Sequence, residues 1–382
     1  NLYTGLTTVT EGELRLNTTG GQAIAGDVAV SGGTLRLLQS DQINSSSSLL
    51  VSGGTFALQG FNQTLAGVQL TGGSISSSSG VLTSASAFDL QSGTVSAILG
   101  GTTGVVKTSS GVVTLSGANV FSGGTQVNAG MLIGTSTAAL GSNSSLSVAS
   151  GATFAYRPTA AGSLNLGTGA ITLVGGSTIG TAVGGALSQS VIQSSSAATA
   201  SGSINVDLFI ISGGSVTSGT HNLITASGGL TSGGASYTLG TLYNATNFTV
   251  SSLSATDTTV SINVASAAIL TAAYWKGGLS AGNNVWALSD GTTSNWVTNA
   301  NGTGATPLVP GAGATVHFSA TGAANQSAMT LGAAMSIRNL VVNDTSAVTL
   351  NADGHSLTIA NAAGITVNSG AGAVTLNAPV IL

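Results

Sequence analysis

Ten acidic residues are the first candidates for catalysis in this chain of 382 residues. Enzymes that cleave polysaccharides need carboxylates close together, usually beside a lysine or an arginine. Only Glu11 and Glu13 are neighbours in the sequence, and Asp344 with Asp353 is the nearest other pair. We therefore expect solvent-exposed acids in turns and no enzyme. A polysaccharide lyase or hydrolase is the catalytic alternative.

Metal and cofactor chemistry would need converging ligands or a phosphate-binding loop. The three histidines, His221, His317 and His355, lie far apart in the sequence, and the chain contains no cysteine. The Gly-Gly-x-Gly-x-Asp calcium repeat, the EF-hand loop and the Gly-x-Gly-x-x-Gly fingerprint do not occur. We therefore expect no metal and no cofactor.

Aromatic residues suggest a binding surface instead. One segment, residues 274–318, contains all three tryptophans and two of the four prolines. Its aromatic side chains could form a platform for a glycan or for a neighbouring subunit, or a small core that caps the fold. The candidate interface or ligand platform comprises Tyr274, Trp275, Trp286 and Trp296.

The charge content of the chain is unusually low. Asp, Glu, Lys and Arg make up 4% of the residues, whereas roughly a quarter is typical of soluble domains. The six basic residues are scattered, so we expect no nucleic-acid partner. No apolar stretch reaches the ~18 residues that a membrane-spanning helix needs. Hydrophobic residues still amount to 42%, which is enough to bury a long core.

A short internal repeat organises the sequence. The string Val30-Ser-Gly-Gly-Thr-Leu35 returns at positions 51–56, 70–75 and 90–95, with a weaker copy at 211–216. A period of this length suits one coil of a β-solenoid, in which each strand pairs with its equivalent one coil later. Gly-Gly supplies tight corners, and alternation sends aliphatic residues inward and Ser, Thr and Asn outward. The sequence predicts an all-β parallel solenoid of about 20 residues per turn.

A longer motif carries a family resemblance. Residues 111–132 resemble the autotransporter-associated β-strand repeat, also called the passenger-associated transport repeat, and residues 1–14 match its second half. The resemblance implies a right-handed parallel β-helix on a bacterial surface or secreted from it. Its repeat-motif positions in this sequence are Leu115, Gly117, Asn119, Phe121, Gly123, Thr125, Val127, Gly130 and Leu132.

These patterns predict four segments. We expect a solenoid with autotransporter-type repeats over 1–160, a continued solenoid or β-rich segment over 161–273, a Trp-containing, loop-rich insertion over 274–318, and further solenoid turns over 319–382.

The function predicted from the sequence is structural. We expect an extracellular or cell-surface protein that assembles end to end into a fibre or layer, because solenoid ends are open strand edges and few charges oppose association. Its partners would be copies of itself or tandem repeats of a larger chain. The alternative is an adhesin stalk that binds a glycan or a host surface.

Overall fold

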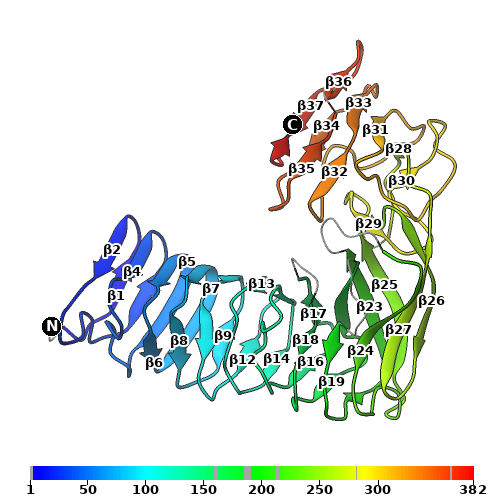
Figure 1. Ribbon diagram of the computed structural model, residues 1–382. Coiled ribbons are helices and arrows are strands. Elements are labelled where there is room, and N and C mark those ends of the chain that lie inside the picture. Colours follow the sequence, from blue (N-terminus) through cyan, green and yellow to red (C-terminus); the bar gives the residue numbers. More distant parts are fainter. Residues whose placement is uncertain (1–2, 159–161, 185–190, 211–215, 281, 362–363) are drawn as a thin grey trace.

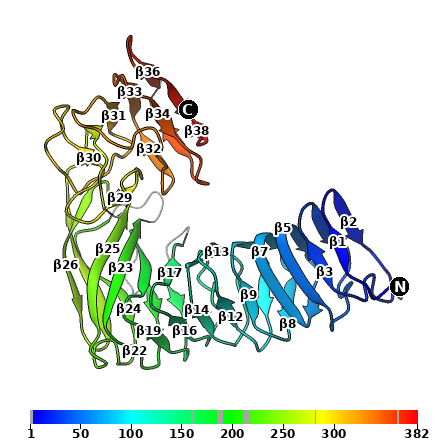
Figure 2. The same cartoon turned by 180° about the vertical axis from the view of Figure 1, so that it is seen from behind.

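The computed structural model describes residues 3–158, 162–184, 191–210, 216–280, 282–361 and 364–382. Among these residues there are strands, turns and bends but no helix, so none could span a membrane as a helix. The chain winds into a β-solenoid of about 17 turns of roughly 21 residues each, which confirms the all-β solenoid predicted from the repeat. The N-terminal part of the chain forms a first rod. The chain then bends, and a second, shorter solenoid follows the bend and contains the C-terminus (Figures 1 and 2).

The first rod has three faces, each a parallel ladder of strands from successive coils. The long strands β5 and β7 continue around one corner and belong to faces one and two. The strands of face one are β1 (Thr7–Val9), β3 (Val28–Val30), β5 (Ser48–Gln59), β7 (Gly67–Ser77), β9 (Phe88–Leu90), β12 (Val105–Lys107), β14 (Thr125–Val127), β16 (Leu146–Val148), β19 (Ile171–Leu173) and β22 (Thr199–Ala200).

Faces two and three complete each coil. Face two contains β2 (Glu13–Leu16), β4 (Thr34–Leu37), β10 (Gly93–Val95), β13 (Val112–Leu115), β15 (Met131–Gly134), β17 (Thr153–Tyr156), β20 (Thr178–Val183), β23 (Ser203–Ile210) and β25 (Ser236–Tyr243). Face three contains β6 (Gln63–Leu65), β8 (Val81–Ser84), β11 (Ile98–Gly100), β18 (Leu164–Asn165), β21 (Ile192–Gln193) and β24 (Gly219–Thr225).

The sequence spacing between paired residues follows the repeat in the early coils and increases in the later ones. Val9 pairs with Val30 and Val30 with Val51, so the early coils keep the spacing of the repeated string. Later coils are longer. Val206, for example, pairs with Leu239, which lies about half a coil beyond the position that the repeat predicts. The copy of the repeat at 211–216 lies almost wholly outside the described residues.

Antiparallel strands end the first rod. The hairpin of β26 (Phe248–Ala255) and β27 (Thr259–Ser266) pairs with β24, and β29 (Leu288–Ser289) pairs with β25. Nothing in the sequence pattern predicted this reversal.

The second solenoid has its own hydrophobic core, from Ala273 to Ala378, whereas the core of the first rod extends from Val9 to Val264. The segment boundaries expected from the sequence stay predictions. The strands of the second solenoid are β28 (Ala272–Trp275), β30 (Trp296–Val297), β31 (Thr315–Phe318), β32 (Met335–Ile337), β33 (Asn339–Val342), β34 (Val348–Leu350), β35 (Leu357–Ile359), β36 (Ile365–Val367), β37 (Val374–Leu376) and β38 (Val380–Ile381).

Close approach between coils explains the Gly-Gly corners. A Cβ atom on Gly54 would lie 2.5 Å from the carbonyl oxygen of Gly32, and one on Gly73 would lie 2.2 Å from that of Gly54. Gly73 also has a φ of 77°, which side-chain-bearing residues rarely adopt. The repeated glycines therefore let corners of successive coils stack directly on one another.

Candidate functional site

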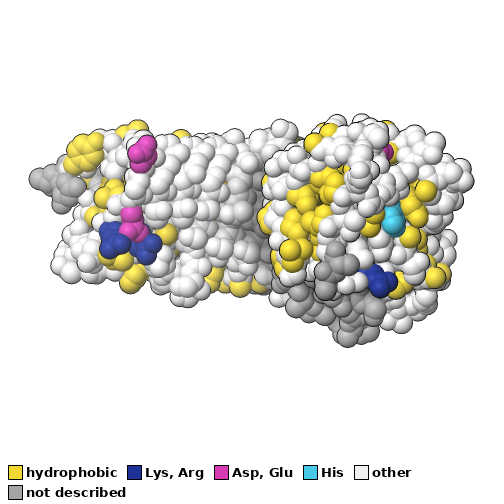
Figure 3. Space-filling model, turned by 90° about the horizontal axis from the view of Figure 1, so that it is seen from above, with side chains coloured by type: hydrophobic (Ala, Val, Ile, Leu, Met, Phe, Trp, Pro, Cys, Tyr) yellow, Lys and Arg dark blue, Asp and Glu magenta, His cyan; other side chains and the backbone are white. Residues whose placement is uncertain are grey.

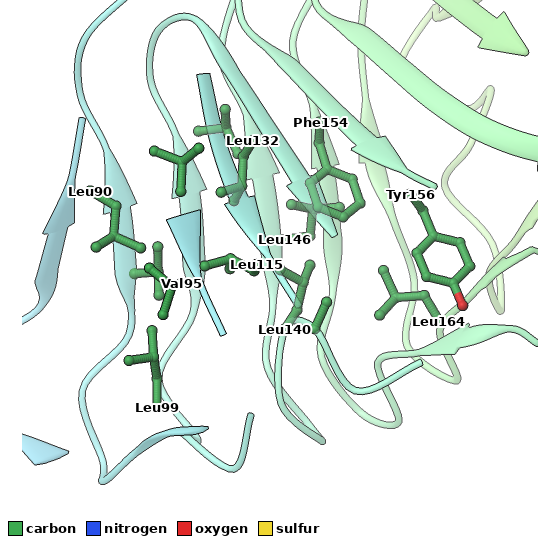
Figure 4. Close-up of a cluster of buried hydrophobic side chains, with 14 of the residues drawn as sticks. Leu90, Val95, Leu99, Leu115, Leu132, Leu140, Leu146, Phe154, Tyr156 and Leu164 are labelled. Carbon is green, nitrogen blue, oxygen red and sulfur yellow. The ribbon is translucent and has the colours of Figure 1, made fainter. Parts of the chain in front are cut away.

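The repeat motif, residues 111–132, spans about one coil in the middle of the first rod and contributes to β13 and β15 of face two. Its hydrophobic positions Leu115, Phe121, Val127 and Leu132 are fully buried. Leu115 and Leu132 lie inside the coil among leucines from neighbouring turns (Figure 4). These side chains supply the interior column that successive coils share, and full burial of each such side chain is worth about 1.5–3 kcal/mol.

The glycines of the motif stand where coils approach most closely. Added Cβ atoms would come within 2.2 Å of Ala97 O at Gly117, 2.3 Å of Gly104 N at Gly123 and 2.4 Å of Ser109 O at Gly130. All of these atoms belong to the backbone of the preceding coil, so they cannot move aside like a flexible side chain. The motif glycines are therefore packing requirements.

Asn119 joins three coils through its buried amide. Its Oδ1 accepts a hydrogen bond of 2.8 Å from the backbone N–H of Leu99, and its Nδ2 donates one of 2.6 Å to the carbonyl of Ala139. Face three has no regular strand at this position, and the side chain adds to the bonds that the backbone N–H groups of Asn119 and Val120 donate to the carbonyls of Ala138 and Leu99. Thr125, the remaining polar motif residue, is also fully buried, and its Oγ1 has no hydrogen-bond partner among the described residues.

Sequence reasoning missed a second buried amide with the same role. Gln63 accepts a hydrogen bond from the N–H of Ile43 and donates one of 2.8 Å to its carbonyl, so the side chain imitates a strand partner. Gln63 lies on β6, also on face three. The signal available in the sequence was its place in the alternation, two residues from Phe61 and two from Leu65, but a glutamine in such a Ser- and Thr-rich chain does not stand out.

The structure contradicts the aromatic platform. Trp275, Trp286 and Trp296 are fully buried, with Trp296 edge-on to the other two indoles at 5.1 and 5.2 Å between ring centroids. The Trp296 Nε1–H donates to the carbonyl of Trp286 at 2.8 Å. Because no indole face reaches solvent, these residues form the centre of the second core, the alternative considered above.

Tyr274 is partly exposed and stacks on His317 across β28 and β31, with 4.6 Å between ring centroids. The two rings cover each other's faces. Burial lowers the pKa of His317 below its ordinary value. Of the four predicted platform residues, only Tyr274 therefore touches solvent, and it is engaged within its own sheet.

The carboxylates serve mainly as acceptors for backbone N–H groups in turns. Asp257 is the clearest case: N–H groups of Gly229, Thr231 and Ser232 donate to it, in that order of effect, and lower its pKa to about 2. Other backbone-bonded acids are Asp27, Asp41, Asp207, Asp290, Asp344 and Asp353. Among the described residues, no three His, Cys, Asp or Glu side chains converge as metal ligands.

An unpredicted charged cluster lies on the outer side of face two. The Arg157 guanidinium lies 3.7 Å from the ring centre of Phe209, which itself stacks on Tyr243. Burial lowers the pKa of Arg157 and raises that of Asp207, while the Thr241 N–H and Arg157 partly offset the shift of Asp207. The Nε of Arg157 is buried and has no hydrogen-bond partner among the described residues, so stacking on the aromatic rings is the main contact of the guanidinium.

These features define a structural class: a parallel β-solenoid whose coils are joined by glycine corners and buried amides. The family model described as passenger-associated-transport-repeat matches residues 1–16 and 105–133. The matched segments are those that carried the resemblance, which is thereby confirmed, and they identify a passenger-like β-helical domain. No curated protein matches the chain.

Replacing Asn119 by alanine should lower the free energy of unfolding by on the order of 3 kcal/mol, because the Leu99 N–H and the Ala139 carbonyl lose their buried partner. Urea unfolding followed by circular dichroism measures the change. Asn128→Ala, at an exposed position of the same motif, is the control and should change little. Equal effects of the two substitutions would show that the bridge is dispensable.

The lowered pKa of Asp257 predicts that the folded protein loses stability in acid. Its folded pKa is depressed, so its contribution is complete above the ordinary aspartate value of 3.8 and disappears as the pH falls toward 2. Melting temperatures between pH 5 and pH 2 should fall less steeply in Asp257→Asn than in the wild type. Glu11→Gln controls for the loss of one negative charge, and parallel profiles for wild type and Asp257→Asn would refute the assignment.

Proposed function

We propose that this chain is a non-catalytic structural rod, extracellular or displayed on a bacterial surface, that associates end to end with further copies of itself. The observation that carries the proposal is the stacking of coils that contain few charges, each hydrogen-bonded to the next within the first rod and within the second solenoid. The association of the matched repeat with secreted or surface-displayed passenger domains supports the location.

The surface chemistry supports a structural role. On the face drawn in Figure 3, charged side chains form isolated spots on an otherwise uncharged surface. Between coils, polar side chains bond to polar side chains of the neighbouring coil, as Gln39 does to Asn17 at 3.2 Å and Asn377 to Asn351 at 3.3 Å. Such ladders need no charge, and few like charges oppose the approach of another rod.

The first and last of the described coils each contain strands that are paired on one side only. Within the described residues, β1 pairs only with β3, and β36 only with β33. The outermost coil of the second solenoid exposes apolar side chains, with Val367 at 50% and Ile381 at 53% exposure. Unpaired edges beside exposed apolar groups template strand addition, so a further coil would satisfy both.

End-to-end association predicts a concentration-dependent assembly that edge charges abolish. Wild-type protein should form chains visible by electron microscopy, and Ile365→Lys/Val367→Lys should remain monomeric in sedimentation velocity because lysines would meet the incoming edge. Val120→Lys, at a 60% exposed valine in the middle of the first rod, is the control and should assemble. Wild-type protein that stays monomeric over a wide concentration range would overturn self-assembly.

A second candidate function, glycan binding by an adhesin-like stalk, has support from a groove and not from the tryptophans. An open cavity of about 390 Å³ lies on face one, between β3, β5 and β7. Apolar Ala29 and Leu50 alternate there with hydrogen-bonding Ser48 and Gln69. Sugars present both apolar ring faces and hydroxyl groups, so this mixed lining suits them.

A glycan array tests the second candidate. Wild-type protein should retain a glycan that Ala29→Trp, which fills the groove, no longer binds. Thr172→Trp places the same indole at an equivalent outward position farther along face one and should bind like the wild type. Absence of binding, or unchanged binding by Ala29→Trp, would exclude the groove as a glycan site.

A further inference from the structure

One charged side chain interrupts the aliphatic interior of the first rod. Strand β12 places Lys107 at an inward position beside Val127 of the next coil, and the whole residue is inaccessible to solvent. The neighbouring strands of face one end inward with Leu90 and Val148. Among the lysines and arginines of the described residues, Lys107 alone is fully buried.

The buried ammonium of Lys107 donates hydrogen bonds only to neutral groups. It donates to the carbonyl of Ser109, to the carbonyl of Ala129 at 3.2 Å and to the Ser109 hydroxyl at 3.4 Å. Ion pairs of the described residues join Glu13 with Arg15 and Arg36, and none involves Lys107. Removal of an ion from water costs several kcal/mol even after relaxation, and no opposite charge in direct contact offsets that cost here.

The coil that leads to Lys107 is also short, and two valines that follow Lys107 in the sequence are exposed. Val105 pairs with Phe88 on one side and with Thr125 on the other, and the chain between Phe88 and Val105 is the shorter of the two connections. Val112 is 48% exposed and Val120 is 60% exposed. At the inward position of Lys107 the neighbouring strands have Leu90 and Val148, so the coil with the lysine gains less hydrophobic stabilisation there than its neighbours.

We propose that the coil from Ile98 to Gly111 is a built-in opening point, at which the first rod separates into two blocks of coils before it unfolds as a whole. The block before it ends with β10 and the block after it begins with β13, so the opening also breaks the direct pairing of these two strands on face two. The inference is independent of the proposed function, since it concerns a single chain.

Protonation of the amine controls the opening. Asp89, one coil earlier, is the titratable group that acts on Lys107; β13 and β14 have none. Burial lowers the pKa of Lys107, and Asp89 partly opposes that shift. The folded state therefore disfavours the protonated form of Lys107. The coil becomes more stable as the pH rises toward the ordinary lysine pKa, because a larger fraction of the amine is then neutral.

Hydrogen exchange read by mass spectrometry tests the proposal on dilute wild-type protein, Lys107→Met and Lys276→Met. In the wild type, amides of β12 and β13 should exchange about tenfold faster than those of β7 and β16, because local opening exposes them. Methionine removes the buried charge and keeps the length of the side chain, so Lys107→Met should abolish the difference. Lys276, whose Nζ bonds to Thr321 O at 2.7 Å in the second solenoid, is the matched control and should leave the difference intact.

Two kinds of result would contradict the opening point. Uniform exchange along the wild-type rod would mean that no opening point exists. Faster exchange in Lys107→Met, or failure of that variant to fold, would mean that the ammonium holds the two corners together and strengthens the coil. Either result overturns the proposal without affecting the assembly experiment, which reads a different end of the molecule.

Discussion

Hydrogen bonding between successive coils is the constraint on which the rest of this structure depends. A strand with only three or four residues is too short to be stable alone, so each coil needs the backbone groups of the coils before and after it. Pairing at the spacing of a β-sheet brings corners within contact of one another. That spacing leaves no room for a Cβ atom at Gly54, Gly73 or Gly117. The glycines at these corners are therefore a consequence of coil stacking.

The first coils could be predicted because the repeat itself encodes their register. Equivalent positions in the Val-Ser-Gly-Gly-Thr strings become partners, as Val30 and Val51 do, since identical patterns place identical side chains inward. The later coils could not be predicted in this way. Long connections such as the one from Val206 to Leu239 insert loops of varying length, and the antiparallel hairpin of β26 and β27 follows no repeat at all.

The residues of the candidate site also fall into those that the sequence predicts and those that it does not. Apolar and glycine positions of the motif were predictable, because alternation and tight corners assign them directly. The side of the strand on which Lys107 lies was not, since Val105-Val106-Lys107 can place either Val106 or Lys107 inward. Only pairing with β14 resolves this choice, and pairing is a long-range property. The tryptophans illustrate the converse error: conspicuous aromatic residues suggest a surface, but a segment with few strands also needs large side chains to fill its interior.

Two buried amides in this rod add hydrogen bonds between coils on face three, where the strands are short or absent, and they help to explain how a solenoid tolerates irregular coils. Asn119 and Gln63 supply the donor and acceptor that a missing strand residue would have provided. Because both partners are backbone groups, such an amide can repair any coil regardless of the side chains there. Lys107 differs, since it offers donors but no acceptor and adds a charge. A solenoid can therefore vary its coil length at little cost where amides substitute for pairing, whereas a lysine at the same depth concentrates instability in one coil.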